Sequence, residues 1–190
     1  MASLYESKKN YSQAKNYYLQ ALETRKSFFK EDHLHVAISL SNLARFYVTQ
    51  ERYVEAEKIE LQSLEMAQKL LGIEHPSLAA SLRNLAGIYK EQKLYTKAKE
   101  FYFKSLKIDK QELHSDNIHI IGDLNYLGKI YYDQKKYNQA KEIYLKVLYF
   151  KKYLLELNPK NLGIAMNNLA KLYVIEGNLN KAKSLVEEAV

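Results

Sequence analysis

The sequence predicts an all-α protein, an α-solenoid in which antiparallel helix pairs stack into a right-handed superhelix. Three observations support this prediction. The chain of 190 residues repeats itself every 42 residues, each repeat holds two helical patterns of apolar residues, and helix breakers are scarce, with two prolines and six glycines. Such a composition disfavours a turn-rich sandwich or barrel, and a long in-phase repeat is typical of stacked helical units.

The repeat is visible in two blocks of sequence. NYSQAK at 10–15 recurs as RYVEAE at 52–57, LYTKAK at 94–99, KYNQAK at 136–141 and NLNKAK at 178–183. SNLARFY at 41–47 recurs as RNLAGIY at 83–89, NYLGKIY at 125–131 and NNLAKLY at 167–173. The common step predicts a single array of about 4.5 repeats, with units 1–32, 33–74, 75–116, 117–158 and 159–190. Because the first and last units are incomplete, we expect a fragment of a longer protein.

Each repeat begins with one amphipathic helix and continues with a second. In the first helix of unit 33–74, Leu40, Leu43 and Tyr47 fall on one face. In the second helix, Ala56 and Leu64 keep a similar face. Two apolar faces in one short unit predict a helical hairpin that buries them against its neighbours.

The links between helices carry turn and cap residues. Within a repeat, two or three polar residues such as 51–52 separate the helices, and so short a turn makes them antiparallel. Between repeats, Gly72 suits the end of a helix, and His75-Pro76 suits the start of the next. These signals place the helix boundaries.

Small and aromatic residues recur at fixed positions and are the predicted core. The small residues are Ala44, Ala86, Gly128 and Ala170 in first helices, and Ala14, Ala56, Ala98, Ala140 and Ala182 in second helices. The tyrosines form three columns: Tyr5, Tyr47, Tyr89, Tyr131 and Tyr173; Tyr11, Tyr53, Tyr95 and Tyr137; and Tyr18, Tyr102 and Tyr144. Small residues let two helices approach closely, and the tyrosines fill the wider gaps.

Composition excludes several classes of protein and site. The absence of cysteine excludes a disulfide framework and a thiolate metal site. No apolar run approaches the roughly 20 residues that cross a bilayer, and the first ten residues contain no apolar stretch typical of a secretory signal. We therefore expect a cytoplasmic protein without membrane insertion.

Motifs for catalysis, metal binding or cofactor binding are not found. The five histidines, at positions 33, 35, 75, 114 and 119, are spread over links and helix starts, without metal-ligand spacing. No glycine-rich phosphate loop and no nucleophile elbow is present. The sequence therefore predicts no enzymatic activity, no metal and no cofactor, and His33, His75 and His114 are interpreted as link and cap residues.

The pattern L-x-N-L-A-x-x-Y, about nine residues and then A-x-x-x-Y resembles the tetratricopeptide repeat. The 42-residue period and the stretch LGIEHPSLAASLRNLAGIYKEQKLYTKAKEFY at 71–102 resemble the kinesin light chain subclass of this family. The resemblance covers essentially the whole chain. It implies that first helices line a concave groove, and that this groove holds a peptide segment.

Counting around the first helices gives the candidate groove residues. They are Ser41, Arg45, Arg83, Lys90, Asn125, Lys129, Tyr132, Asn167 and Lys171, with Asn42, Asn84, Asn168 and Val48 as further candidates; Gly87 occupies the register position of Arg45. Arginine and lysine on a concave surface attract acidic partners. A second interpretation of these cations is a solvated surface on a chain of net charge +7. The column of asparagines either contacts the ligand or ties one helix to its neighbour, and the tie is favoured.

The leading functional hypothesis is a non-catalytic protein–protein interaction scaffold that binds an acidic peptide, extended or in a short helix. One alternative is a helical repeat that binds nucleic acid, which the positive charge permits. This alternative is disfavoured, because the groove positions differ in every repeat instead of forming a repeated code. A third hypothesis is end-to-end self-assembly of the solenoid into a homo-oligomer.

Overall fold

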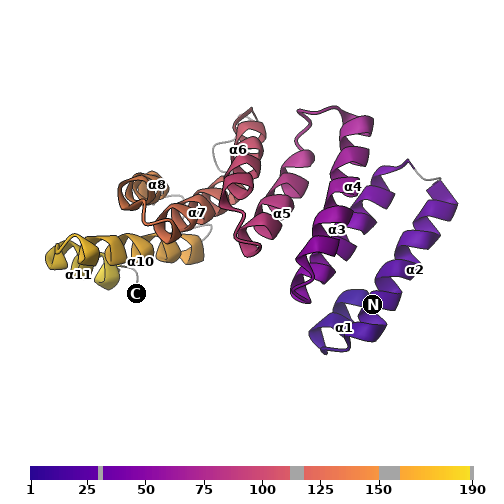
Figure 1. The fold of residues 1–190 in the computed structure, drawn as a ribbon, viewed down its shortest axis with the longest axis horizontal. Coiled ribbons are helices and arrows are strands. Elements are labelled where there is room, and N and C mark those ends of the chain that lie inside the picture. The colour runs from indigo at the N-terminus through magenta and orange to yellow at the C-terminus, as the bar shows by residue number, and fades with distance from the viewer. Residues whose placement is uncertain (30–31, 112–117, 150–158, 189–190) are drawn as a thin grey trace. The chain divides into compact units, whose positions relative to one another are not determined.

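The computed structural model describes residues 1–29, 32–111, 118–149 and 159–188, and over these residues the chain forms ten helices and no strand (Figure 1). The helices are α1 (Ala2–Ser7), α2 (Tyr11–Phe29), α3 (Leu34–Thr49), α4 (Tyr53–Leu71), α5 (Leu78–Glu91), α6 (Tyr95–Gln111), α7 (Ile118–Asp133), α8 (Tyr137–Tyr149), α10 (Pro159–Ile175) and α11 (Leu179–Glu188). They form two compact units, Met1–Ile108 and Asp109–Val190. The first unit contains α1 to α5 and most of α6, and the second contains α7 to α11.

Each predicted repeat interval contains one antiparallel helix pair, so the predicted all-α fold of stacked pairs is confirmed. In the first unit, each helix from α1 to α4 packs against the next in the chain, and α3 also contacts α5. In the second unit, α10 packs against α7, α8 and α11. First helices therefore lie beside first helices, which is the arrangement that a shared binding face requires.

The turn inside each pair has the same backbone in all five repeats. A residue in the left-handed region, with φ between 57° and 75°, occurs at Lys9, Glu51, Lys93, Lys135 and Gly177. The next N–H donates to the carbonyl of the tyrosine five residues earlier, at 2.8–3.0 Å. This is the hydrogen bond of a Schellman motif, which satisfies a carbonyl at the helix end. Four of the five left-handed residues carry side chains, although the left-handed region favours glycine.

The predicted core columns are buried or half-buried in the structure, except at Tyr11. The recurring alanines of the second helices are between 0% and 6% exposed, and Tyr18, Tyr102 and Tyr144 are likewise buried. Tyr11, however, is 40% exposed and does not belong to the core. Its counterpart Tyr137 packs edge-on against Tyr132, with ring centroids 5.6 Å apart. In the first repeat the position of Tyr132 is occupied by Glu6, which offers no aromatic surface.

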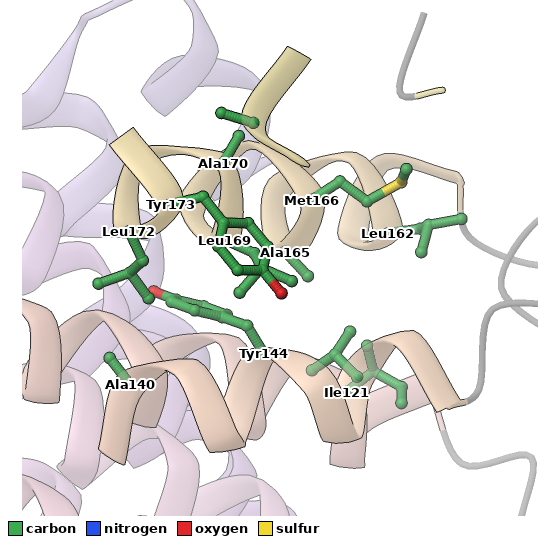
Figure 2. Packing of buried hydrophobic residues seen from close by; sticks show 12 residues of the cluster. Ile121, Ala140, Tyr144, Leu162, Ala165, Met166, Leu169, Ala170, Leu172 and Tyr173 are labelled. Atoms are coloured by element: carbon green, nitrogen blue, oxygen red, sulfur yellow. The ribbon is translucent and has the colours of Figure 1, made fainter. Parts of the chain in front are cut away.

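The core of the second unit is built around Tyr144, which is 1% exposed. Figure 2 shows its side chain pointing from α8 toward Leu169 and Leu172 on α10. Its ring also packs against α7 at Gly128, where an added β-carbon would lie 2.5 Å from Tyr144 Cε1. Glycine at position 128 is therefore required by the ring. The core of the first unit includes Ala14, Leu43 and Phe46.

In two links between repeats, a histidine side chain accepts a backbone N–H near the start of the next helix. His33 is the N-cap of α3, and its Nδ1 accepts a hydrogen bond from the His35 N–H at 3.1 Å. His75 Nδ1 accepts from the Ser77 N–H at 3.2 Å in the next link. Both agree with the interpretation of these histidines as cap residues. His114 lies outside the described residues.

Candidate functional site

A buried carboxylate joins the first helices α3 and α5 of the first unit. Glu60 lies on α4 at the register position that holds tyrosine at 18, 102 and 144, and its side chain is fully buried. Glu60 Oε1 accepts hydrogen bonds from Ser41 Oγ at 3.0 Å and from Asn84 Nδ2 at 3.1 Å. Asn84 Nδ2 also donates to Ser41 Oγ at 3.0 Å. We call these three residues the Glu60 cluster, and it connects α3, α4 and α5.

Burial sets the electrostatics of the Glu60 cluster. Loss of solvent raises the pKa of the Glu60 carboxyl, and the hydrogen bonds from Asn84 and Ser41 oppose this rise. Glu60 Oε2 is buried and has no hydrogen-bond partner among the described residues. The cluster also fixes the orientation of the exposed Asn84 amide, because its Nδ2 is held on the protein side. Sequence analysis missed Glu60, although the break in the tyrosine column at position 60 would have shown it.

Arg45 lies on the exposed side of α3, beside the hydroxyl of Tyr18. That hydroxyl donates to Glu6 Oε2 at 2.8 Å, and Thr49 Oγ1 donates to Glu6 Oε1 at 3.1 Å. Burial and the Glu6 carboxylate raise the pKa of Tyr18, and the Arg45 guanidinium acts in the opposite direction. Arg45 therefore places an exposed positive charge beside the Tyr18 hydroxyl.

The two cations predicted on α5 have neighbours in the protein. Arg83 is half-buried, and its Nη1 donates to Ser105 Oγ on α6 at 3.0 Å. Lys90 Nζ lies 2.9 Å from a carboxylate oxygen of Glu91, and its side chain is 20% exposed. Between them lies Gly87, which contributes no side chain to this face. The α5 face therefore carries a basic side chain at each end, with Lys90 paired to Glu91, and is flat in the middle.

A pocket of about 560 Å³ opens in the first unit between α1, α2 and α3. Its lining includes Tyr17, Tyr18, Arg25, Asn42 and Arg45. The Arg25 guanidinium is held by a bond from Nη1 to Ser39 Oγ at 2.6 Å. Two predicted residues, Asn42 and Arg45, thus lie in a cavity with a second arginine. Sequence analysis missed Arg25 because it considered only first helices as groove elements.

The predicted residues of the second unit have mixed surroundings. Asn125 is buried, and its Nδ2 donates to the Asn161 carbonyl at 2.9 Å, so it braces α10. Lys129 pairs with Asp133 at 3.2 Å. Of the other predicted groove residues in this unit, Asn167 and Lys171 are exposed on α10, and Tyr132 is half-buried on α7.

The asparagine column shows how helices of successive repeats are tied together. Asn84 on α5 bonds to Glu60 on the preceding α4, and Asn168 on α10 is hydrogen-bonded to Tyr144 on the preceding α8. Asn42 lines the pocket described above, and Val48 is half-buried against the core of the first unit. At positions 84 and 168, therefore, the asparagine side chain bridges two helices.

The sequence was compared with models of known protein families. A family model of the tetratricopeptide repeat matches residues 1–69 and 36–111, and a second model of this repeat matches residues 124–155. The chain belongs to the tetratricopeptide repeat family. No curated protein matches the sequence.

Solved structures confirm the predicted fold and the resemblance to kinesin light chain repeats. BtubC (BKLC) from P. vanneervenii superposes with a TM-score of 0.88 at 22% identity, covering 99% of this tetratricopeptide repeat chain and 75% of that chain. A putative kinesin light chain from Podosopora anserina with nearly identical TPR-like repeats gives 0.81 at 22% identity, covering 99% and 89%. MamA gives 0.65 at 15% identity, covering 100% and 92%.

The tetratricopeptide fold suggests a protein–protein interaction scaffold. Among the described helices, none has a long enough apolar stretch to cross a membrane. Over the same residues, no three histidine, aspartate or glutamate side chains gather as a metal site would require.

Proposed function

We propose that this chain is a non-catalytic scaffold that holds an acidic peptide segment against the adjoining faces of α3 and α5. The observation that carries the proposal is the hydrogen bond from Asn84 Nδ2 to Ser41 Oγ at 3.0 Å. Because this bond brings the two first helices side by side, Arg45 on α3 and Arg83 on α5 flank one surface. An acidic segment lying across it would meet a guanidinium on each helix.

Charge alone does not supply enough affinity for this role. An exposed ion pair contributes about 1 kcal/mol or less, so binding also needs a buried anchor. The pocket between α1, α2 and α3 offers such an anchor site, with Tyr17 for apolar contact and with Arg25 and Arg45 in its lining for a carboxylate. Ile38, 51% exposed on α3, adds apolar surface next to the same face.

We propose that the second unit contributes less to peptide binding than the first unit does. Lys171 and Asn167 are exposed on α10, whereas Lys129 is already paired with Asp133. A ligand carboxylate at Lys129 must compete with that aspartate. We also place the interaction in the cytoplasm, since a chain without cysteine has no need of an oxidising compartment.

The proposal is tested with a random peptide display library and two charge-reversal variants. We expect the unaltered protein to select peptides enriched in aspartate and glutamate, and Arg45→Glu to lose them. Lys58→Glu is the matched control, because it makes the same charge change on an exposed position of α4. Circular dichroism and urea unfolding verify that both variants fold.

Two results would contradict the proposal. One is a selection without acidic enrichment, and the other is equal loss of binding in Arg45→Glu and Lys58→Glu. Binding of a homopolymer RNA that Arg45→Glu removes would favour the nucleic-acid alternative instead. A molar mass that rises with protein concentration in light scattering would favour self-assembly.

A further inference from the structure

Gly87 is a glycine that the fold does not require. It lies inside α5, where glycine destabilises a helix relative to alanine. An added β-carbon at Gly87 would meet none of the described atoms within 4 Å, whereas one at Gly128 would lie 2.5 Å from the ring of Tyr144. Packing explains the glycine at 128 and leaves the glycine at 87 unexplained.

The neighbours of Gly87 point to the surface that bears the proposed function. Gly87 occupies the register position of Arg45 in α3, Lys129 in α7 and Lys171 in α10, so α5 lacks the long cationic side chain that these helices carry at this position. On α5 itself, Arg83 lies one turn before it and Lys90 lies one turn after it. The α5 helix therefore presents bare backbone between two cations.

Asn84 places an orienting group beside this bare backbone. It lies three residues before Gly87, on the adjoining part of the α5 surface. The Glu60 cluster fixes its amide through Nδ2, and the residue is exposed. A ligand at Gly87 thus meets a preorganised amide, which costs little side-chain ordering on binding.

We propose that the main chain of an extended acidic peptide passes directly over Gly87, closer to α5 than a β-carbon would allow. This inference rests on the proposed function and selects the extended form of the ligand over the helical form. Close approach of a ligand backbone is a recognised use of glycine. A helical ligand holds its backbone away from the surface with its own side chains, and therefore gains nothing from a bare position.

An extended ligand also suits the charges around Gly87. Successive side chains of an extended peptide point to opposite sides. With the main chain over Gly87, acidic side chains on one side reach toward Arg45 on α3, and those on the other side reach toward the cations of α5. Gly87 then acts as a specificity-determining residue, because it sets the depth at which the peptide lies.

The test uses Gly87→Ala, with Gly163→Ala as its matched control. Gly163 is also a helical glycine, on α10, and among the residues that the structure describes an added β-carbon there meets no atom within 4 Å. Both substitutions should raise the midpoint of thermal unfolding, by about 2 °C. Fluorescence anisotropy with the acidic peptide selected from the library should show about ten-fold weaker binding to Gly87→Ala. Binding to Gly163→Ala should be unchanged.

The outcomes separate this inference from the proposed function. If Gly87→Ala binds as tightly as the unaltered protein while Arg45→Glu does not bind, the inference falls and the proposed function stands. If Gly87→Ala lowers the unfolding midpoint, the glycine serves packing and the inference falls. Equal weakening in Gly163→Ala also overturns it. Both proposals fail if the library yields no acidic peptide. They also fail if Gly87→Ala weakens the binding of a single-stranded RNA instead of the binding of a peptide.

Discussion

Two junctions between successive repeats use the same register positions with different chemistry. In the first unit, α4 meets α5 through Glu60 and Asn84, and in the second unit α8 meets α10 through Tyr144 and Asn168. Both asparagines come from the later repeat and bond to a side chain of the earlier one. The earlier side chain is a carboxyl in one junction and a phenol in the other.

The two junctions differ in what they provide to the protein. The Tyr144 ring fills volume between helices, at the cost of a glycine at 128. Burial raises the pKa of its hydroxyl well above the usual value, which keeps the phenol neutral. The Glu60 carboxyl fills less volume, but it also engages Ser41 and so reaches a third helix. The first junction is therefore built for the arrangement of polar groups, and the second for packing.

The largest expected effect in this comparison comes from Gly128→Ala. The new methyl group would overlap the Tyr144 ring and force it out of its position, so we expect the free energy of unfolding to fall by about 2 kcal/mol. Urea unfolding followed by circular dichroism measures the change. Gly163→Ala is the control and should be slightly stabilising. Equal stability of Gly128→Ala and the unaltered protein would show that the ring does not depend on this glycine.

A smaller effect is expected from Glu60→Gln, and its sign depends on pH. Because folding raises the pKa of Glu60, the folded state keeps this proton to higher pH than the unfolded state. The carboxyl therefore contributes stability that is fully present below its unfolded pKa, about 4.3, and is lost as pH rises through the folded pKa. At pH 7 we expect the free energy of unfolding of Glu60→Gln to exceed that of the unaltered protein by about 1 kcal/mol.

Urea unfolding at pH 4 and pH 7 tests this expectation. The advantage of Glu60→Gln should shrink toward pH 4, where the carboxyl of the unaltered protein is neutral. Glu65→Gln, an exposed position on the same helix, controls for the general effect of removing a charge. An advantage of the same size at both pH values would show that burial of the carboxylate is not the cause.

The smallest effect concerns a feature that all repeats share. Gly177 is the glycine among the five left-handed turn residues, with φ of 75°. We expect Gly177→Ala to lower the free energy of unfolding by about 0.5–1 kcal/mol, because a β-carbon is disfavoured in this region. Lys93→Gly, the converse change, should not destabilise the protein. A larger loss at 177 than this would mean that the last turn, unlike the others, depends on glycine.

The fold could be predicted from the sequence because its determinants are local and repeated. The step of 42 residues places each helix pair inside its predicted interval, and the columns at Ala56 and Tyr102 are buried as expected. Tyr11 was the exception, since its burial depends on which side chain the preceding helix supplies. For the turn inside each helix pair, the sequence predicted two or three polar residues. It did not predict which of them adopts the left-handed conformation.

The candidate site could be predicted only in part. The pairing of Lys129 with Asp133 follows from their spacing of four along one helix. The bonds of Arg83 to Ser105 and of Asn125 to the Asn161 carbonyl join different helices, and no spacing within one helix reveals them. Arg25 enters the pocket from a second helix for the same reason.

The sequence by itself determined the repeat length, the helix pairs and the core columns, because helical periodicity decides which residues share a face. Only the tertiary structure decided how Glu60 is used. In the sequence, a glutamate at this position predicts an exposed side chain. In the packed structure Glu60 is buried between three helices, its pKa is raised, and it accepts hydrogen bonds from Ser41 and Asn84. The physical reason is that periodicity is a property of one segment, whereas solvent exclusion is a property of the packed helices together.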